Sequence, residues 1–323
     1  LCLRISWGPG TAFVFPESIL REPLVKELFD NPNIRWITHN GKFDSVFLQQ
    51  LGLNARVDED TMLAHYLLDE LKGGHDLKTL AGDLLGAPDY DSEMKKKYLR
   101  KKTDTYEKIP KPELYQYMAK DADYTLRIFH ILMKELEAQP PLLAAYRRLL
   151  IPSSAFLAKV ESAGIYIDPI NHAKITRRLQ GQLDDANIRI MQVAEPYWNA
   201  HNFMIDSGAK KEPEFFNPGS PIQLGWLLYK ALKLRPKGRA KVGKSGEWST
   251  DETTLLSLPP HPVVKAVLDM RENAKALSTY ANGIAERIEP DGRVHATYLI
   301  HGTVTGRLAS RNPNMQNITR PQK

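Results

Sequence analysis

The chain of 323 residues is long enough for two domains of ordinary size, each with its own core. Hydrophobic residues make up 42% and charged residues 25%, which is the balance of a globular protein. No run of about 18 apolar residues is present, which excludes a membrane-spanning segment. The single cysteine, Cys2, excludes a disulfide framework and a cysteine metal site, and it favours an intracellular location.

The net charge of +6 indicates a polyanionic partner if the positive charge is clustered. Two long segments, 215–246 and 292–323, contain no Asp or Glu at all. The first carries the basic residues Lys230, Lys233, Arg235, Lys237, Arg239, Lys241 and Lys244. Such a run predicts non-specific contacts with phosphates, although a solvated charged loop is the alternative reading.

The first half reads as an α/β region. Residues 1–37 alternate as strand, turn, strand, helix and strand, and a helix is expected from Gly41 to Leu51. Short helices follow, with Gly86 as a C-terminal stop, and 91–105 is expected to be a charged loop. Pro112 then opens a long amphipathic helix that ends near Glu137.

The segment "AQPP" at 138–141 is expected to interrupt regular structure, and the second half after it is predominantly helical. Helices are expected over 142–163, 169–198 and 261–288, with a shorter helix after the turn "FNPGSP". A Gly- and Lys-rich loop covers 235–250, and "RVHATYLI" alternates as a strand.

One candidate site is "THNGKFDSVFL", in which a strand delivers Asn40 and Asp44 to the start of a helix. A carboxylate at that place commonly meets a metal ion or a phosphate-rich ligand. The alternative is that Asp44 only stabilises the first helical turn, where acidic residues are favoured.

A second candidate is "YMAKDADYTL" on the long helix. Tyr117 and Asp121 are four residues apart and so share a face, which continues through Tyr124 and Ile128. A carboxylate on a partly buried face needs a partner, because burying it alone is costly. A divalent cation would serve, with Tyr117 orienting a water molecule, and a buried ion pair with Lys or Arg is the alternative. Asp123, on the other side, is expected to be solvated.

Together, "HNGKFD" and "YMAKDADYTL" resemble the second and third motifs of the 3′-5′ exonuclease of family A (bacterial polymerase I-like) DNA polymerases. "DEDTMLAHYLLDE" between them also resembles the family. The resemblance implies hydrolysis of a terminal phosphodiester by two Mg²⁺ or Mn²⁺ ions held by four carboxylates. Asp44 and Asp121 would be two of these metal ligands, Tyr117 would position the attacking water, and Asn40 and Phe43 would contact the single-stranded 3′ end.

The family carries its other two carboxylates in a D-x-E motif on a strand upstream of the region that "LCLRISWGPGTAFVFP" resembles. The acids that precede Asp44 show no such motif. The chain is therefore expected to hold an incomplete two-metal site and no proofreading activity of its own.

The segment "TVTGRLASRNPNMQNI", residues 303–318, carries arginines and amides without an acid. It resembles the family segment T-G-R-L-S-S-x-x-P-N-L-Q-N-I-P, which lies along the minor groove of the primer–template duplex. Guanidinium and amide groups suit the acceptors that every base pair presents there, whereas a carboxylate would be repelled by the phosphates. The residues that the resemblance places on DNA here are Thr305, Arg307, Asn314, Gln316 and Asn317. Ala309, in place of serine, and Thr319-Arg320, in place of proline, depart from the pattern.

Other segments resemble the same family. "FNPGSPIQL" would place Asn217 and Ser220 near the primer strand, and "RENAKALSTY" would direct Arg271 and Lys275 toward DNA. The Lys-rich loop 233–244 would form the tip of the thumb.

The resemblance implies an α/β ribonuclease H-like exonuclease domain over 1–139, a mainly α-helical polymerase thumb over 140–290, and the edge of the palm over 291–323. The sequence is expected to be a piece of a DNA-directed DNA polymerase acting in replication or repair, which ends before the palm carboxylates. It should bind primer–template DNA and a single-stranded 3′ end, and deoxynucleotides only in the full-length parent. An intracellular location is expected, in cytoplasm or nucleoid, or in host cytoplasm for a virus. The alternatives are a stand-alone DEDD-type exonuclease and a non-catalytic DNA-binding subunit of a split polymerase, completed by a second chain.

Overall fold

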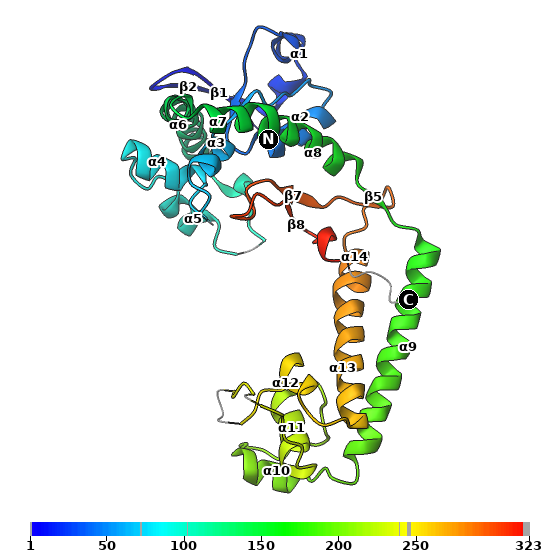
Figure 1. Ribbon diagram of the computed structural model, residues 1–323. Coiled ribbons are helices and arrows are strands. Elements are labelled where there is room, and N and C mark those ends of the chain that lie inside the picture. The colour runs from blue at the N-terminus through cyan, green and yellow to red at the C-terminus, as the bar shows by residue number, and fades with distance from the viewer. Residues whose placement is uncertain (1, 72, 102, 239, 244–246, 319–323) are drawn as a thin grey trace. The chain divides into compact units, whose positions relative to one another are not determined.

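The computed structural model describes residues 2–71, 73–101, 103–238, 240–243 and 247–318. The chain divides into two compact units, and each is considered by itself (Figure 1). Unit 1 comprises 1–165 together with 295–323, and unit 2 comprises 166–294. Within the described ranges, no helix combines the length and the apolar character needed to cross a bilayer.

Unit 1 joins short strands to a set of helices. Its elements are β1 (Cys2–Gly8), β2 (Thr11–Pro16), η1 (Glu17–Arg21), α1 (Pro23–Asp30), β3 (Ile37–Thr38), α2 (Gly41–Gln50), β4 (Glu59–Asp60), α3 (Thr61–Leu68), α4 (Leu77–Leu85), α5 (Ser92–Tyr98), η2 (Tyr106–Lys108), α6 (Lys111–Glu137), α7 (Pro140–Ala145), η3 (Tyr146–Leu150), α8 (Ile151–Ala163), β7 (Thr297–Leu299), β8 (Ala309–Arg311) and η6 (Met315–Asn317). The pairs β1–β2 and β7–β8 are antiparallel, and β3–β4 is parallel.

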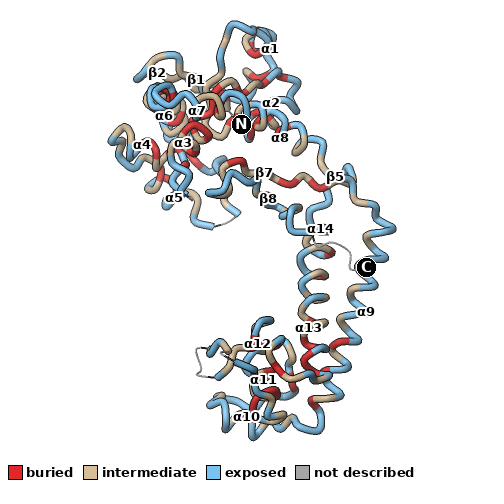
Figure 2. The backbone as a smooth tube through the Cα atoms, viewed as in Figure 1, coloured by how far each residue is buried: buried red, intermediate tan, exposed pale blue. Residues whose placement is uncertain are grey.

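Unit 2 is helical. Its elements are α9 (Pro169–Ala194), α10 (Ala200–Ser207), α11 (Pro221–Gly225), η4 (Trp226–Ala231), α12 (Glu252–Leu256), α13 (Pro262–Lys275), η5 (Ala276–Asn282) and α14 (Gly283–Ala285). Strands β5 (Ile165–Tyr166) and β6 (Arg293–Val294) lie at the two places where the chain passes between the units. Helices α9 and α13 run side by side, and buried residues gather where they meet α11 (Figure 2).

Local sequence explains where the long helices begin and end. Helix α9 starts after Asp168, whose side chain accepts hydrogen bonds from the backbone at 170 and 171, and Pro169 takes the first helical position. Helix α4 stops at Gly86, which has a positive φ of 63°. The expected helices over 112–137, 169–198 and 261–288 are all present, although α9 ends at Ala194 and the last continues from α13 through π-helical turns.

Two expectations are wrong in detail. The charged stretch 91–105 is not all loop, because Ser92–Tyr98 forms α5, in which Lys95 pairs with Asp91 one turn away. The strand expected before α2 shrinks to Ile37–Thr38, since only these two residues pair with β4.

Residues 140–163 pack on the first half of the chain. Tyr146, Leu150 and Leu157 are buried in the same cluster as residues of α3, α4 and α6, and Ile300 from the C-terminal segment joins them. The predicted domain limits at 139 and 290 were drawn from the resemblance of sequence segments to a family. The two compact units are defined by contacts between residues, which is a different criterion, so the limits stay predictions.

Tyr146 is fully buried, and its hydroxyl accepts a hydrogen bond of 2.7 Å from the backbone N–H of Asp60. Tyr146→Phe leaves this N–H without its partner inside the protein, so we expect the free energy of unfolding to fall by about 1–3 kcal/mol. Denaturant unfolding of the variant measures this. Tyr197→Phe, which changes an exposed tyrosine, serves as the control. Equal stabilities of Tyr146→Phe and the unaltered chain would contradict the prediction.

Histidines gather where the C-terminal segment meets α3 and α4. The Nδ1 atoms of His65 and His75 are 2.9 Å apart, and the ring of His301 lies 6.3 Å from that of His75. Burial, and then His75, lowers the pKa of His301 to about 4.

Below a pH of about 6.5 the unfolded chain takes up a proton at His301 before the folded chain does, so stability is lost as the pH falls from about 6.5 toward 4. Because His301 is partly exposed, we expect its contribution between pH 7 and 5 to be about 1 kcal/mol. The unfolding free energy of His301→Asn should therefore fall less over this range than that of the unaltered chain. His130→Asn, at an exposed position on α6, should behave like the unaltered chain.

Candidate nuclease site and nucleic-acid interface

The carboxylate of Asp60 fixes the start of the first candidate motif. It is buried and accepts hydrogen bonds from the backbone N–H groups of Asn40 (3.1 Å) and Gly41 (2.8 Å), and also caps α3 through Met62 and Leu63. Burial raises the pKa of Asp60, and these four backbone hydrogen bonds act against that rise. One carboxylate therefore caps the N-termini of both α2 and α3.

Asn40 enters α2 in the left-handed conformation, with φ 58° and ψ 42°. The next residue has no room for a side chain, because a Cβ on Gly41 would lie 2.1 Å from the hydroxyl of Thr38. This tight entry places Phe43 and Asp44 in the first turn, with Phe43 exposed and its ring 4.9 Å from that of Phe47.

Asp44 is exposed at the surface of α2. Desolvation by the neighbouring protein raises the pKa of its carboxyl, Arg4 acts against this rise, and Asp60 and Asp121 add to it. Because the charge of Asp121 acts on the pKa of Asp44, the two predicted metal ligands lie in the same region of unit 1.

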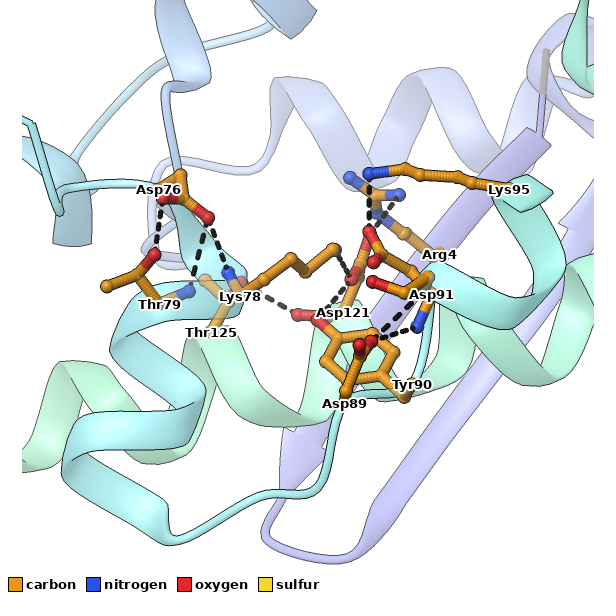
Figure 3. Close-up of polar contacts among 11 residues, drawn as sticks. Arg4, Asp76, Lys78, Thr79, Asp89, Tyr90, Asp91, Lys95, Asp121 and Thr125 are labelled. Atoms are coloured by element: carbon orange, nitrogen blue, oxygen red, sulfur yellow. Dashed lines mark hydrogen bonds and ion pairs between the residues drawn. The ribbon is translucent and has the colours of Figure 1, made fainter. Parts of the chain in front are cut away.

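Asp121 is buried and already surrounded by positive charge (Figure 3). Its Oδ1 contacts the Lys78 ammonium and accepts a 2.8 Å hydrogen bond from the hydroxyl of Tyr90. Its Oδ2 pairs with Arg4 Nη1 at 3.2 Å. The structure contains the buried ion pair that was one of the two readings of the sequence, and the role of Asp121 as a metal ligand stays a prediction.

The ring of Tyr117 belongs to the same group of side chains. The Lys78 ammonium lies 4.6 Å from its centroid, and the Tyr90 and Tyr106 rings lie 5.9 and 6.2 Å away. Burial raises the pKa of the Tyr117 hydroxyl, so it stays protonated. Asp123 was expected to be solvated. Instead, its carboxylate accepts a hydrogen bond of 2.5 Å from the backbone N–H of Gly10.

These residues do not make a complete site for a pair of divalent ions. Among the described residues, no three His, Cys, Asp or Glu side chains are grouped so that they could hold a metal ion. Asp44 and Asp121 supply two carboxylates, and cationic side chains already contact both oxygens of Asp121. This arrangement therefore supports no metal-dependent step.

The segment 303–318 is anchored to unit 1 at several points. The hydroxyl of Tyr66 donates to the carbonyl of Thr303 at 2.6 Å, and Thr303 Oγ1 donates to the carbonyl of Arg307 at 2.7 Å. Further along, the side-chain oxygen of Asn314 accepts hydrogen bonds from Ser310 Oγ (2.9 Å) and the Gln316 N–H (3.2 Å). The predicted DNA-contacting residues of this segment are all exposed: Thr305, Arg307, Asn314, Gln316 and Asn317.

The predicted DNA-contacting residues of unit 2 differ in whether their side chains are hydrogen-bonded within the protein. The guanidinium of Arg271 is tied to Thr250, through its carbonyl and through its hydroxyl at 3.1 Å. Lys275 is exposed one turn later on α13. In the turn before α11, Asn217 Oδ1 accepts from the Gly219 N–H at 2.8 Å, and Ser220 caps the helix.

The basic loop is described in part. Lys230, on η4 ahead of the loop 233–244, pairs with Glu247 at 3.0 Å, and Lys233 at the start of the loop has a positive φ of 55°. Arg239 and Lys244 lie outside the described residues, as do Thr319 and Arg320.

Several residues of the nuclease region were missed by sequence reasoning. The pattern of an acid before "TMLAHYLL" is typical of a helix N-cap and would have identified Asp60. Lys78, Arg4 and Tyr90 left no such signal, because they approach Asp121 from positions 43, 117 and 31 residues away in the sequence.

Sequence models of two families match the chain. A model of DNA polymerase family A matches residues 201–323, and a 3′-5′ exonuclease model matches residues 5–137. The DNA polymerase of Escherichia phage T5 is 32% identical over 315 residues, which cover 92% of this chain and 36% of the phage protein. DNA polymerase I of Treponema pallidum is 30% identical over 298 residues, which cover 91% of this chain and 27% of that protein.

Among solved structures, the chain is similar to the POL domain of Pol1 from M. smegmatis in complex with DNA primer-template and dNTP. The TM-score is 0.71 at 25% identity, and the match covers 97% of this chain and 48% of that one. The chain thus spans about a third of the two curated relatives and about half of this structural neighbour. The matches run through both halves of the sequence: residues 5–137 match the 3′-5′ exonuclease family, and residues 201–323, which follow them, match DNA polymerase family A.

Proposed function

We propose that this chain is the part of a DNA-directed DNA polymerase that carries the exonuclease-domain region and holds the duplex, and that it binds primer–template DNA. The match to DNA polymerase family A supports this, together with a structural neighbour that holds a DNA primer-template and dNTP. In the proposal, unit 1 carries a ribonuclease H-like exonuclease domain, and the helices of unit 2 form the thumb. Exonuclease and polymerase domains of this kind generally use divalent metal ions, and the proposal includes Mg²⁺ or Mn²⁺ for the whole enzyme.

The observation that carries the proposal is the exposed, acid-free surface of 303–318. Its guanidinium and amide groups are donors, and the minor groove offers purine N3 and pyrimidine O2 acceptors at every base pair. A surface of this kind recognises the groove without reading the sequence, as copying any template requires. The anchoring by Tyr66 and Ser310 gives these donors fixed positions, which lowers the entropic cost of binding.

A stand-alone exonuclease is the weaker candidate, because the polymerase match covers 201–323, beyond the nuclease motifs. A DNA-binding subunit of a split polymerase would use the same surface and differs only in which chain supplies the palm.

We expect Arg307→Ala to weaken binding to a primer–template duplex by about 3–10-fold, equally for duplexes of different sequence, since the contact is not base-specific. The slope of log K against log salt should become shallower, because a cationic group near the phosphates is lost. Fluorescence anisotropy of labelled duplexes at several salt concentrations measures both quantities. Arg21→Ala, which removes the same charge from η1, should leave binding unchanged. A loss confined to one duplex sequence would contradict the proposal.

We expect a polypeptide of these 323 residues to show negligible exonuclease activity and no nucleotide incorporation with Mg²⁺ or Mn²⁺. The nuclease region supplies two of the carboxylates that a two-metal reaction needs, and 292–323 supplies none to a polymerase site. Denaturing gels of an end-labelled primer, with and without dNTPs, test both activities. Shortening or extension of the primer at rates typical of enzymes would show that this chain completes a site by itself.

A further inference from the structure

The C-terminal end of α8 holds the chain where it enters β7. The backbone carbonyl of Glu161, in the last turn of α8, lies 2.7 Å from His295 Nδ1. Gly164, which caps the helix, has a φ of 62°, and a Cβ there would lie 2.7 Å from the Cε1 atom of His295. The His295 ring therefore packs directly on the backbone at the end of α8, where a larger residue would push it away.

The side chain of Glu161 fixes β7 itself. Its Oε1 accepts a hydrogen bond of 2.6 Å from the backbone N–H of Tyr298, which is paired with Ser310 of β8. In an antiparallel pair, each backbone N–H points either to the neighbouring strand or to the outer edge, and the N–H of Tyr298 points outward to Glu161. The described part of the chain adds no third strand to β7–β8, so the carboxylate is the acceptor that this edge N–H receives.

Lys42 makes the burial of this carboxylate possible. Its ammonium contacts the same oxygen, Oε1, and the side chains of Lys42 and Glu161 are only 8% and 12% exposed. Burying either charge alone would be costly, so the two are buried as a pair. At this exposure the ammonium serves Glu161 and is not a surface cation.

The opposite edge of β7 leads to the predicted duplex contacts. Ser310, which faces Tyr298 across the strand pair, is buried. Its Oγ donates to the side-chain oxygen of Asn314 at 2.9 Å and accepts from the backbone N–H of Gln316 at 3.3 Å. A continuous set of contacts within unit 1 therefore runs from Glu161 to two of the exposed residues predicted to meet the duplex.

We propose that Glu161 is a positioning residue for duplex binding, which acts through β7 and β8 on Asn314 and Gln316. The inference rests on the proposed function. Groups that are already held in place lose less conformational entropy when they bind, and an unbonded Tyr298 N–H would free β7 and raise that cost. The part of Glu161 that positions β7 is its oxygen, whereas the ion pair with Lys42 keeps this oxygen buried.

Two double variants separate the oxygen from the charge. Both carry Lys42→Met, which avoids a buried, unpaired ammonium. The first adds Glu161→Gln, which keeps an oxygen for the Tyr298 N–H, and the second adds Glu161→Met, which has a similar length and no oxygen. We expect the Gln variant to bind a primer–template duplex within about twofold of the unaltered chain, and the Met variant to bind it about fivefold more weakly.

Fluorescence anisotropy at several salt concentrations measures these affinities. The slope of log K against log salt should be the same in both variants and in the unaltered chain, because no cationic group that meets phosphates is removed. Hydrogen exchange of the Tyr298 amide supplies a readout without DNA, and it should be faster in the Met variant alone.

The matched control is Lys26→Met with Asp30→Asn, which removes an ion pair from the exposed surface of α1. It should equal the unaltered chain in duplex affinity and in exchange at Tyr298. Circular dichroism checks the fold of each variant, and Glu161→Leu in the Lys42→Met background takes the place of the Met variant if that variant is misfolded.

Equal duplex affinities of the Gln variant and the folded variant without the oxygen overturn the proposal. A shallower salt slope in the Met variant also overturns it, because that result would indicate a lost phosphate contact in place of lost positioning. If the unaltered chain binds no duplex, the proposed function fails and the inference falls with it. Retained duplex binding with equal affinities refutes the role of Glu161 alone.

Discussion

The nuclease half of this chain depends on one buried carboxylate. Asp60 ends β4 and caps both α2 and α3, and the backbone of the same residue is held by Tyr146 from the helical segment that follows α6. Because helix N-termini carry partial positive charge, a carboxylate that accepts four backbone hydrogen bonds is stabilised although it is buried. The position of every residue of the first motif, from Asn40 to Asp44, follows from this arrangement.

The same physical problem is solved differently at Asp121. No helix terminus is available in the middle of α6, so side chains compensate the buried charge: Lys78, Arg4 and Tyr90. The two buried acids therefore differ in how their charge is compensated: Asp60 by backbone N–H groups at two helix starts, and Asp121 by side chains from other elements.

How much of this could be predicted depends on how far apart the interacting residues are in the sequence. The starts of α6, α9 and α13 follow from the prolines in their first turns, so periodicity and proline positions were enough to predict them. The sharing of Asp60 between two helices and the identity of the partners of Asp121 join residues 19 to 117 positions apart. Sequence reasoning recognised that a buried acid needs a partner, but it had no means of selecting Lys78 over any other cation.

Glu161 connects the nuclease motif with the strand that leads to the proposed duplex-binding segment. Its Oε1 contacts the buried ammonium of Lys42 on α2 and accepts a 2.6 Å hydrogen bond from the N–H of Tyr298 on β7. The carbonyl of the same residue lies 2.7 Å from the Nδ1 of His295, at the start of the C-terminal part of unit 1. One oxygen therefore serves both the helix of Asp44 and the strand before 303–318. Within unit 1, then, the residues proposed to meet the frayed 3′ end and those proposed to meet the duplex are held by the same side chain.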